Sequence, residues 1–175
     1  MKKALWLAFV IFLLPSAARS QETPAAEASI GYSYLRLGGS DGTNQNGGSA
    51  SFAFDVNNWL GIVADAGGYH SSPFGIDFNT YTYMFGPRFS YRGTGRFTPF
   101  TQVLFGGAHN TGSAFGASAS LNSFAFSTGG GVDIRLSHAV AFRPQADYVL
   151  LRSNGSNLNC ARVSAAIVFR FGERR

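Results

Sequence analysis

Charge is scarce in this sequence, and lysine is almost absent. Charged residues make up 13% of the chain, and the two lysines are Lys2 and Lys3, whereas soluble domains contain about 25% charged residues. After residue 14 no apolar run approaches the length of roughly 20 residues that a membrane-spanning helix needs. These absences disfavour a soluble domain and a helical membrane protein. They leave a closed β-barrel as the structure that can satisfy its backbone in lipid.

Cysteine is rare, and the residues that commonly bind metals are not clustered. Cys160 is the only cysteine, so no internal disulfide can form, and we expect a buried or loop thiol. The three histidines, His70, His109 and His138, are scattered along the chain, which disfavours a metal site. We expect neither a metal nor another cofactor.

The N-terminus has the three parts of a secretory signal peptide. Lys2 and Lys3 precede an apolar stretch over residues 4–14, and residues 18–20 place small side chains where a signal peptidase reads. We predict cleavage after Ser20, because the apolar stretch is too short to serve as an uncleaved membrane anchor. Cleavage would remove three basic residues and lower the formal net charge from +5 to +2. So weak a charge does not predict nucleic acid as a partner.

The remaining chain shows hydrophobic alternation with a period of two, which indicates β-strands. The pattern is clearest over residues 160–171, where Val163 and Phe169 share one face and Arg162 and Arg170 share the other. Eight segments of this kind follow the signal peptide: residues 28–37, 48–56, 59–69, 80–91, 97–109, 121–136, 139–151 and 160–171.

The segments between these strands alternate in length. Short turns alternate with polar loops of about ten residues, which are residues 38–47, 70–79, 110–120 and 152–159. An up-and-down barrel with short periplasmic turns and longer outer loops has this asymmetry. Residues 21–27 are expected to form a short exposed lead-in, and residues 172–175 a C-terminal tail. The predicted fold class is all-β, an eight-stranded antiparallel up-and-down transmembrane β-barrel.

The strand faces predict where the few charges lie. The large apolar residues must face lipid because they cannot fit inside a narrow barrel, so the opposite face lines the lumen. Counting back from a turn at residues 137–139 places Asp133 opposite Arg143, and Asp147 faces the same lumen as Arg162. Asp65 and Arg88 form a further balanced pair. The expected interior network comprises Asp65, Arg88, Asp133, Arg135, Arg143, Asp147, Arg162 and Arg170.

Aromatic residues gather at the two ends of the expected strands. Two belts separated by aliphatic residues are typical of the two interfaces of a membrane. The belts comprise Tyr69, Tyr81, Tyr83 and Tyr148 at the loop ends, and Trp59, Tyr91, Phe97, Phe169 and Phe171 at the turn ends. Trp59 and Tyr69 fit least well, since the alternation of residues 59–69 places both on the lumen face unless a bulge intervenes.

Together, the signal peptide, the eight alternating strands and the final IVFRF resemble the small OmpA/OmpX-type outer-membrane β-barrel family, over residues 27–171. The resemblance implies an outer-membrane location, with membrane lipid around the barrel. It also implies that Phe171, together with Phe169, is the strand-end signal that the barrel-assembly machinery recognises during biogenesis. A fold of this kind does not by itself identify an activity.

We expect a non-enzymatic barrel with a plugged polar interior and a structural or surface-interaction role through its extracellular loops, whose ligand the sequence does not identify. A small diffusion pore is the alternative, disfavoured because eight strands leave an interior that side chains roughly fill. A soluble ligand-binding barrel, like a lipocalin, is the rival fold.

A lipid-A-modifying enzyme is the third possible function. It would need a serine, a histidine and a carboxylate within hydrogen-bond reach near the outer leaflet. His70, Ser72 and Asp77 are the candidates at a suitable height. The alternation places them in a loop rather than on a lipid-facing strand, which disfavours this function.

Overall fold

The structure, a computed structural model, describes residues 23–38, 42–72, 77–93, 95–114, 117–153 and 155–174. The signal peptide and its predicted cleavage after Ser20 lie outside these residues. The described chain forms eight strands: β1 (Thr23–Leu37), β2 (Asn44–Asp55), β3 (Leu60–Ser71), β4 (Asp77–Ser90), β5 (Phe97–Ala114), β6 (Ala117–Arg135), β7 (Val140–Ser153) and β8 (Ser156–Arg174).

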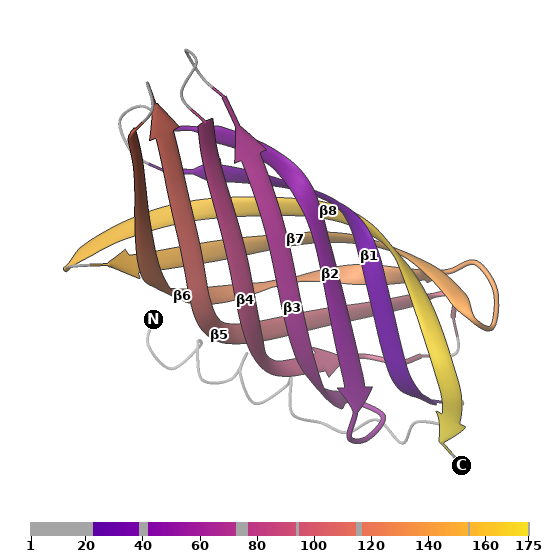
Figure 1. The fold of residues 1–175 in the computed structure, drawn as a ribbon. Coiled ribbons are helices and arrows are strands. Elements are labelled where there is room, and N and C mark those ends of the chain that lie inside the picture. The colour runs from indigo at the N-terminus through magenta and orange to yellow at the C-terminus, as the bar shows by residue number, and fades with distance from the viewer. Residues whose placement is uncertain are drawn as a thin grey trace, which may run out of the picture.

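Each strand pairs antiparallel with its neighbour in sequence, and β8 pairs with β1 to close a barrel (Figure 1). Thr23 pairs with Arg174, so β1 begins and β8 ends at the same rim. This rim, called the turn end, also carries residues 56–59, 91–96 and 136–139; the opposite rim is called the loop end. The predicted fold class is confirmed. Within the described ranges, no helix is long and apolar enough to span a bilayer.

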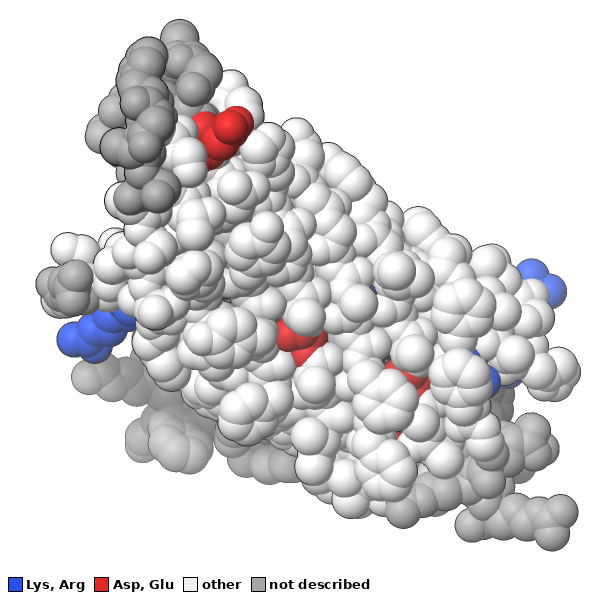
Figure 2. All heavy atoms as spheres, viewed as in Figure 1, with Lys and Arg blue, Asp and Glu red and all other residues white. Residues whose placement is uncertain are grey.

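Side chains alternate between the lumen and the outer surface, as the hydrophobic pattern predicted. In β8, Val163, Ile167 and Phe169 are exposed, whereas the alternate residues Arg162 and Ser164 are buried. The remaining seven strands also present large apolar or aromatic residues outward, and the wall seen in Figure 2 is almost entirely uncharged. Such a surface suits lipid rather than water, because soluble proteins rarely expose apolar patches of this extent.

The strands extend further at the loop end than predicted. β5 and β6, for example, stay paired as far as Ala114 and Ala117. The prediction of ten-residue loops is wrong, because the strands are joined there only by residues 38–43, 72–76, 115–116 and 154–155. Hydrophobic alternation reports contact with lipid, whereas the Gly, Ser and Asn residues of these hairpins continue the backbone hydrogen bonding beyond it.

Three of the changed strand ends alter where a predicted segment or residue lies. β1 begins at Thr23 rather than Ala28, so residues 23–27 belong to the barrel and not to an exposed lead-in. β8 runs to Arg174 and includes most of the predicted tail. β3 includes His70, which had been assigned to a loop. These extensions add one carboxylate to the lumen and one histidine to the outer face.

Candidate functional site in the barrel lumen

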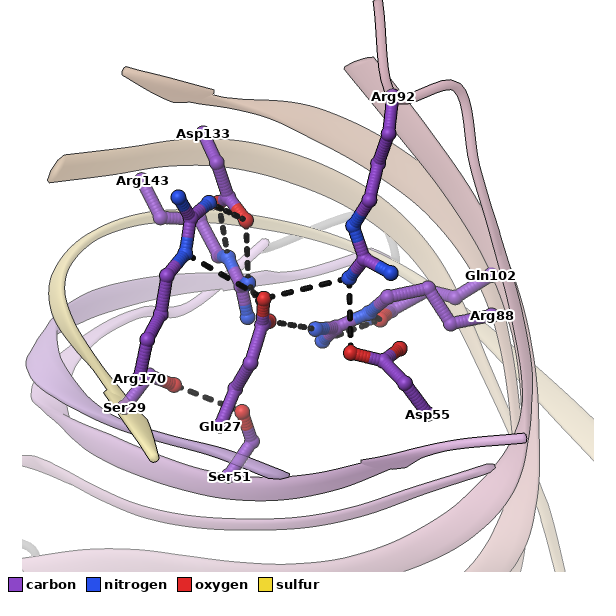
Figure 3. A network of polar contacts seen from close by, with 10 residues as sticks. All are labelled: Glu27, Ser29, Ser51, Asp55, Arg88, Arg92, Gln102, Asp133, Arg143 and Arg170. Carbon is purple, nitrogen blue, oxygen red and sulfur yellow. Dashed lines mark hydrogen bonds and ion pairs between the residues drawn. The ribbon is translucent and has the colours of Figure 1, made fainter. Parts of the chain in front are cut away.

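A buried carboxylate, Glu27 of β1, lies at the centre of the charged side chains in the turn half of the lumen (Figure 3). Its side chain is 3% exposed. Arg143 Nη2 lies 2.8 Å from one carboxylate oxygen, and Arg92 Nη2 lies 3.3 Å from the other. Arg88 and Arg170 approach the same carboxylate at 3.6 and 3.5 Å. Arginines from β4, the 91–96 turn, β7 and β8 thus converge on one acidic group.

Sequence reasoning missed Glu27, although a signal for it was present. Glu27 has the same parity in the strand as Ser29 and Ser33, which the alternation placed on the lumen face. The expected strand began one residue later, because no large apolar side chain precedes it. Arg92 was missed because it follows β4 in a turn, yet its side chain reaches back to Asp55 at 2.8 Å.

Arg143 connects Glu27 to Asp133 on the neighbouring strand. Its Nε and Nη2 donate to the two oxygens of Asp133 at 2.5 and 2.7 Å, so the pair is bidentate. The guanidinium groups of Arg143 and Arg88 also lie over the inward-facing ring of Phe100, at 4.9 and 4.6 Å from its centroid. The sequence count had placed Asp133 opposite Arg143, and the two side chains are in contact.

Gln102 links this network to a second one nearer the middle of the barrel. Its Oε1 accepts from Arg88 Nη2 at 3.0 Å, and its Nε2 donates to Asp147 at 3.4 Å. Asp147 pairs across β7 and β8 with Arg162 at 2.9 Å, and Arg162 also contacts Asp65 at 2.6 Å. The charged side chains therefore form one connected system across the lumen.

Three of the predicted network residues, Asp65, Arg88 and Arg135, have partners other than those expected. Asp65 and Arg88 do not pair, because Asp65 lies opposite Met84, four positions along β4 from Arg88. That spacing is roughly 13 Å at about 3.3 Å per residue. Arg135 lies at the turn end, where its Nη2 donates to the Gly95 carbonyl at 2.7 Å, and it forms no ion pair with a described residue.

The charges in the lumen balance. The turn-end network holds four arginines and three carboxylates: Arg88, Arg92, Arg143, Arg170, Glu27, Asp55 and Asp133. The middle network holds one arginine and two carboxylates: Arg162, Asp65 and Asp147. Five positive groups thus face five negative ones, which is the condition for burying charge at moderate cost. In the described part of the chain, no group of three or more His, Cys, Asp or Glu residues is placed to hold a metal ion.

The loop half of the lumen mixes apolar side chains with uncharged polar ones, because Gln45, Thr80, Thr82 and Ser127 are also buried there. On that side of Arg162, the inward residues form a packed cluster that comprises Leu35, Leu37, Tyr69, Leu104, Ala108, Ala125, Val149, Leu151, Leu158 and Cys160. The charged residues of the predicted polar interior lie in the turn half and near the middle, whereas the loop half holds apolar and uncharged polar side chains. The alternation did not show this, because aliphatic residues on both faces of a strand leave no contrast to read.

Most of the predicted aromatic belt residues lie on the outer surface. Trp59, Tyr91 and Phe97 are exposed near the turn end, as are Phe169 and Phe171, and Tyr81, Tyr83 and Tyr148 are exposed nearer the loop end. The place predicted for Tyr69 is wrong. Its side chain is 2% exposed, and its hydroxyl lies 3.3 Å from Ser33 Oγ inside the lumen. The β3–β4 register passes through Tyr69 without a bulge, so the alternation alone gave the right face.

Solved structures of small barrels resemble this one. Neisserial surface protein A matches with a TM-score of 0.74 and 13% identity, covering 87% of this chain and all of that chain. Ail of Yersinia pestis matches with a TM-score of 0.60 and 19% identity, covering 84% and 100%. The N-terminal barrel domain of Pseudomonas aeruginosa OprF matches with a TM-score of 0.59 and 11% identity, covering 85% and 100%. At these identities the likeness shows the fold alone.

Sequence comparison gives the family. A search of curated proteins finds no match. The model of the outer membrane protein beta-barrel domain, in contrast, matches residues 4–171, which is nearly the whole sequence. The chain therefore belongs to the outer membrane protein beta-barrel domain family, and its outward apolar strands cross the outer membrane.

Proposed function

We propose that this barrel has a closed lumen and a structural or surface-interaction role, exerted through the hairpins at its loop end. The observation that carries the proposal is the filling of the lumen by two successive layers. The charged network, centred on Glu27, occupies the turn half, and the apolar cluster around Leu104 occupies the loop half. A diffusion pore would need a continuous open path, whereas the interior of an eight-stranded barrel is filled by buried side chains such as these. The proposal assigns the lumen no reaction.

The surface role is supported by the form of the loop end. Polar residues such as Asn46, Asn122 and Asn157 are exposed on the hairpins at the loop end. Exposed hairpins on a rigid barrel are common sites of recognition. One barrel of similar shape, Ail, is described as an attachment invasion locus protein and has been solved in complex with the heparin analogue sucrose octasulfate.

Single-channel recording in planar bilayers tests the closed lumen. The purified wild-type barrel should show no steady current after insertion, with insertion verified by compact, boiling-sensitive migration on a gel. Stable, repeated single-channel steps from the correctly folded protein would reject this proposal and favour a pore.

We infer the route to the membrane from the sequence. Cleavage after Ser20 would leave a mature chain beginning at Gln21, which the barrel-assembly machinery would insert from the periplasm. N-terminal sequencing of the protein from purified outer membranes should read QETPAA. Any other start residue would correct the cleavage site without changing the barrel.

A second experiment tests the orientation of the barrel in the membrane. A cysteine introduced at Asn157 in a Cys160→Ala background should react with a membrane-impermeant maleimide on intact cells. Failure to react would place the loop end on the periplasmic side.

A further inference from the structure

A serine, a histidine and an amide lie together on the outer surface at the loop end. His70 on β3 pairs across the strands with Asn79 on β4, and both belong to the outward-facing set that contains Tyr81 and Tyr83. Ser72 follows two residues after His70 and is also exposed. The hydrophobic pattern predicts that this serine and this histidine lie in a loop, but β3 extends to Ser71 and therefore carries His70 on its outward face.

Hydrogen bonds link these three side chains in series. His70 Nδ1 lies 2.8 Å from Asn79 Oδ1, and His70 Nε2 lies 3.1 Å from Ser72 Oγ. An amide oxygen can only accept, so Nδ1 carries the hydrogen, and Nε2 presents its lone pair to the serine. This is the order of groups that activates a serine nucleophile: hydroxyl, imidazole base, and a third group that fixes the imidazole tautomer.

Asp77 is the fourth member of the cluster. Its carboxylate accepts a hydrogen bond from Ser72 Oγ. The serine hydroxyl therefore has two acceptors, and rotation about its Cβ–Oγ bond moves the hydrogen between Asp77 and His70.

The height of the cluster indicates the substrate. The next outward position below His70 on β3 is Gly68, which pairs with Tyr81. Exposed tyrosines at a strand end mark the membrane interface, so His70 and Ser72 lie just above it, beside the headgroups and ester bonds of the outer leaflet.

We propose that Ser72, His70 and Asn79 form an acyl-ester hydrolase site for lipids of the outer leaflet. Ser72 Oγ attacks the ester carbonyl while its proton passes to His70 Nε2. The carbon–oxygen bond to the lipid alcohol then breaks, and His70 returns the proton to the departing alkoxide. Water attacks the resulting acyl-serine, gives its proton to His70, and releases a fatty acid as Ser72 recovers its hydrogen. Asn79 is a positioning residue, and this activity is additional to the role proposed for the barrel.

The barrel provides a matched control on the next pair of strands. His109 Nδ1 lies 2.7 Å from Asn122 Oδ1, which repeats the imidazole–amide half of the site on β5 and β6. Among the described residues, no serine is hydrogen-bonded to the other nitrogen of His109. His109→Ala therefore removes an equivalent surface imidazole without touching the proposed nucleophile or its base.

The experiment measures fatty-acid release by the folded barrel in vesicles of phosphatidylethanolamine and, separately, in vesicles containing lipopolysaccharide. Wild type should release fatty acid from one of these lipids, which identifies the ester source, and Ser72 should be labelled by a fluorophosphonate probe. Ser72→Ala and His70→Ala should each lower the rate by at least about 100-fold, while His109→Ala keeps it. Asn79→Ala should lose activity and Asn79→Asp should recover it, because the carboxylate restores the acceptor for His70 Nδ1.

Several outcomes would overturn the proposal. These are release no greater than in protein-free vesicles from both lipids, release that persists in Ser72→Ala, or equal losses in His70→Ala and His109→Ala. Compact gel migration of each variant shows that it is folded, since all these side chains lie on the surface. A negative result leaves the closed-lumen role intact, because the cluster lies outside the barrel wall.

Discussion

Removal of the Arg143 side chain should destabilise the barrel strongly. Arg143 is 2% exposed and donates to Asp133 at 2.5 and 2.7 Å and to Glu27 at 2.8 Å. Arg143→Ala leaves two buried carboxylates without their closest cation, and breaking a buried ion pair in this way costs about 3 to 5 kcal/mol. A loss of 4 kcal/mol would lower the folding equilibrium constant by roughly a thousandfold.

Urea unfolding in lipid vesicles measures this loss, followed by the fluorescence of Trp59. Trp59 is the only tryptophan after residue 6 and lies exposed on the outer surface, so its emission changes when it leaves lipid. Arg152→Ala, a change of the same side chain at an exposed position of β7, is the control and should stay within about 0.5 kcal/mol of wild type.

A double-mutant cycle tests the specific pair. Asp133→Ala combined with Arg143→Ala should cost less than the sum of the two single changes, because the double change leaves neither partner unpaired at that position. Strictly additive losses would reject the pair. A loss below about 1 kcal/mol for Arg143→Ala would refute the reasoning that the charged network is dry and tightly coupled.

Three further changes test other parts of the account. Glu27→Gln leaves four arginines around a neutral amide, so it should lower the urea midpoint more than Arg152→Ala does; an unchanged midpoint would show that Glu27 is not the centre of the network. Phe171→Asp should reduce assembly in cells, measured as heat-modifiable protein in the outer membrane, more than Arg174→Asp does, and equal effects would show that the chain end rather than the aromatic is recognised. Leu104→Ala should cost about 2 to 5 kcal/mol by opening a cavity in the apolar layer, and a loss below 1 kcal/mol would mean that the layer is loosely packed.

The outer face of the barrel could be predicted from the sequence because lipid contact imposes a strict demand on every second residue. Val163 and Phe169 in β8, and Tyr81 and Phe85 in β4, are exposed where the alternation placed them. The inward position of Gln102 followed from the same rule. Strand number and closure then came from the count of such segments.

The lumen was less predictable because its arrangement depends on which side chains contact one another, and hydrophobic alternation does not show this. Asp133 and Arg143 could be matched by counting from a tight turn, since neighbouring strands share a local register. Glu27 could not, because its contacts with Arg143 and Arg92 cross the lumen between strands far apart in sequence. The apolar cluster of the loop half was equally hidden, since Leu104 and Val149 alternate with residues that are also apolar or aromatic.

The loop-end strand bounds were missed for a different reason. Beyond the hydrocarbon region of the membrane neither lipid tails nor a packed lumen select side chains, so the backbone pairs without leaving a hydrophobic pattern. His70 was assigned to a loop on this ground, and its pairing with Asn79 shows that the hairpin continues.

Solvent access to Cys160 tests the closed lumen most directly. This single native cysteine points into the apolar layer and is 2% exposed. The folded barrel should leave its thiol unmodified by a charged, membrane-impermeant maleimide, whereas the urea-unfolded chain and an Asn157→Cys, Cys160→Ala barrel should react rapidly. Rapid modification of Cys160 in the folded wild-type barrel would show that water passes through the loop half of the lumen, and would contradict the account.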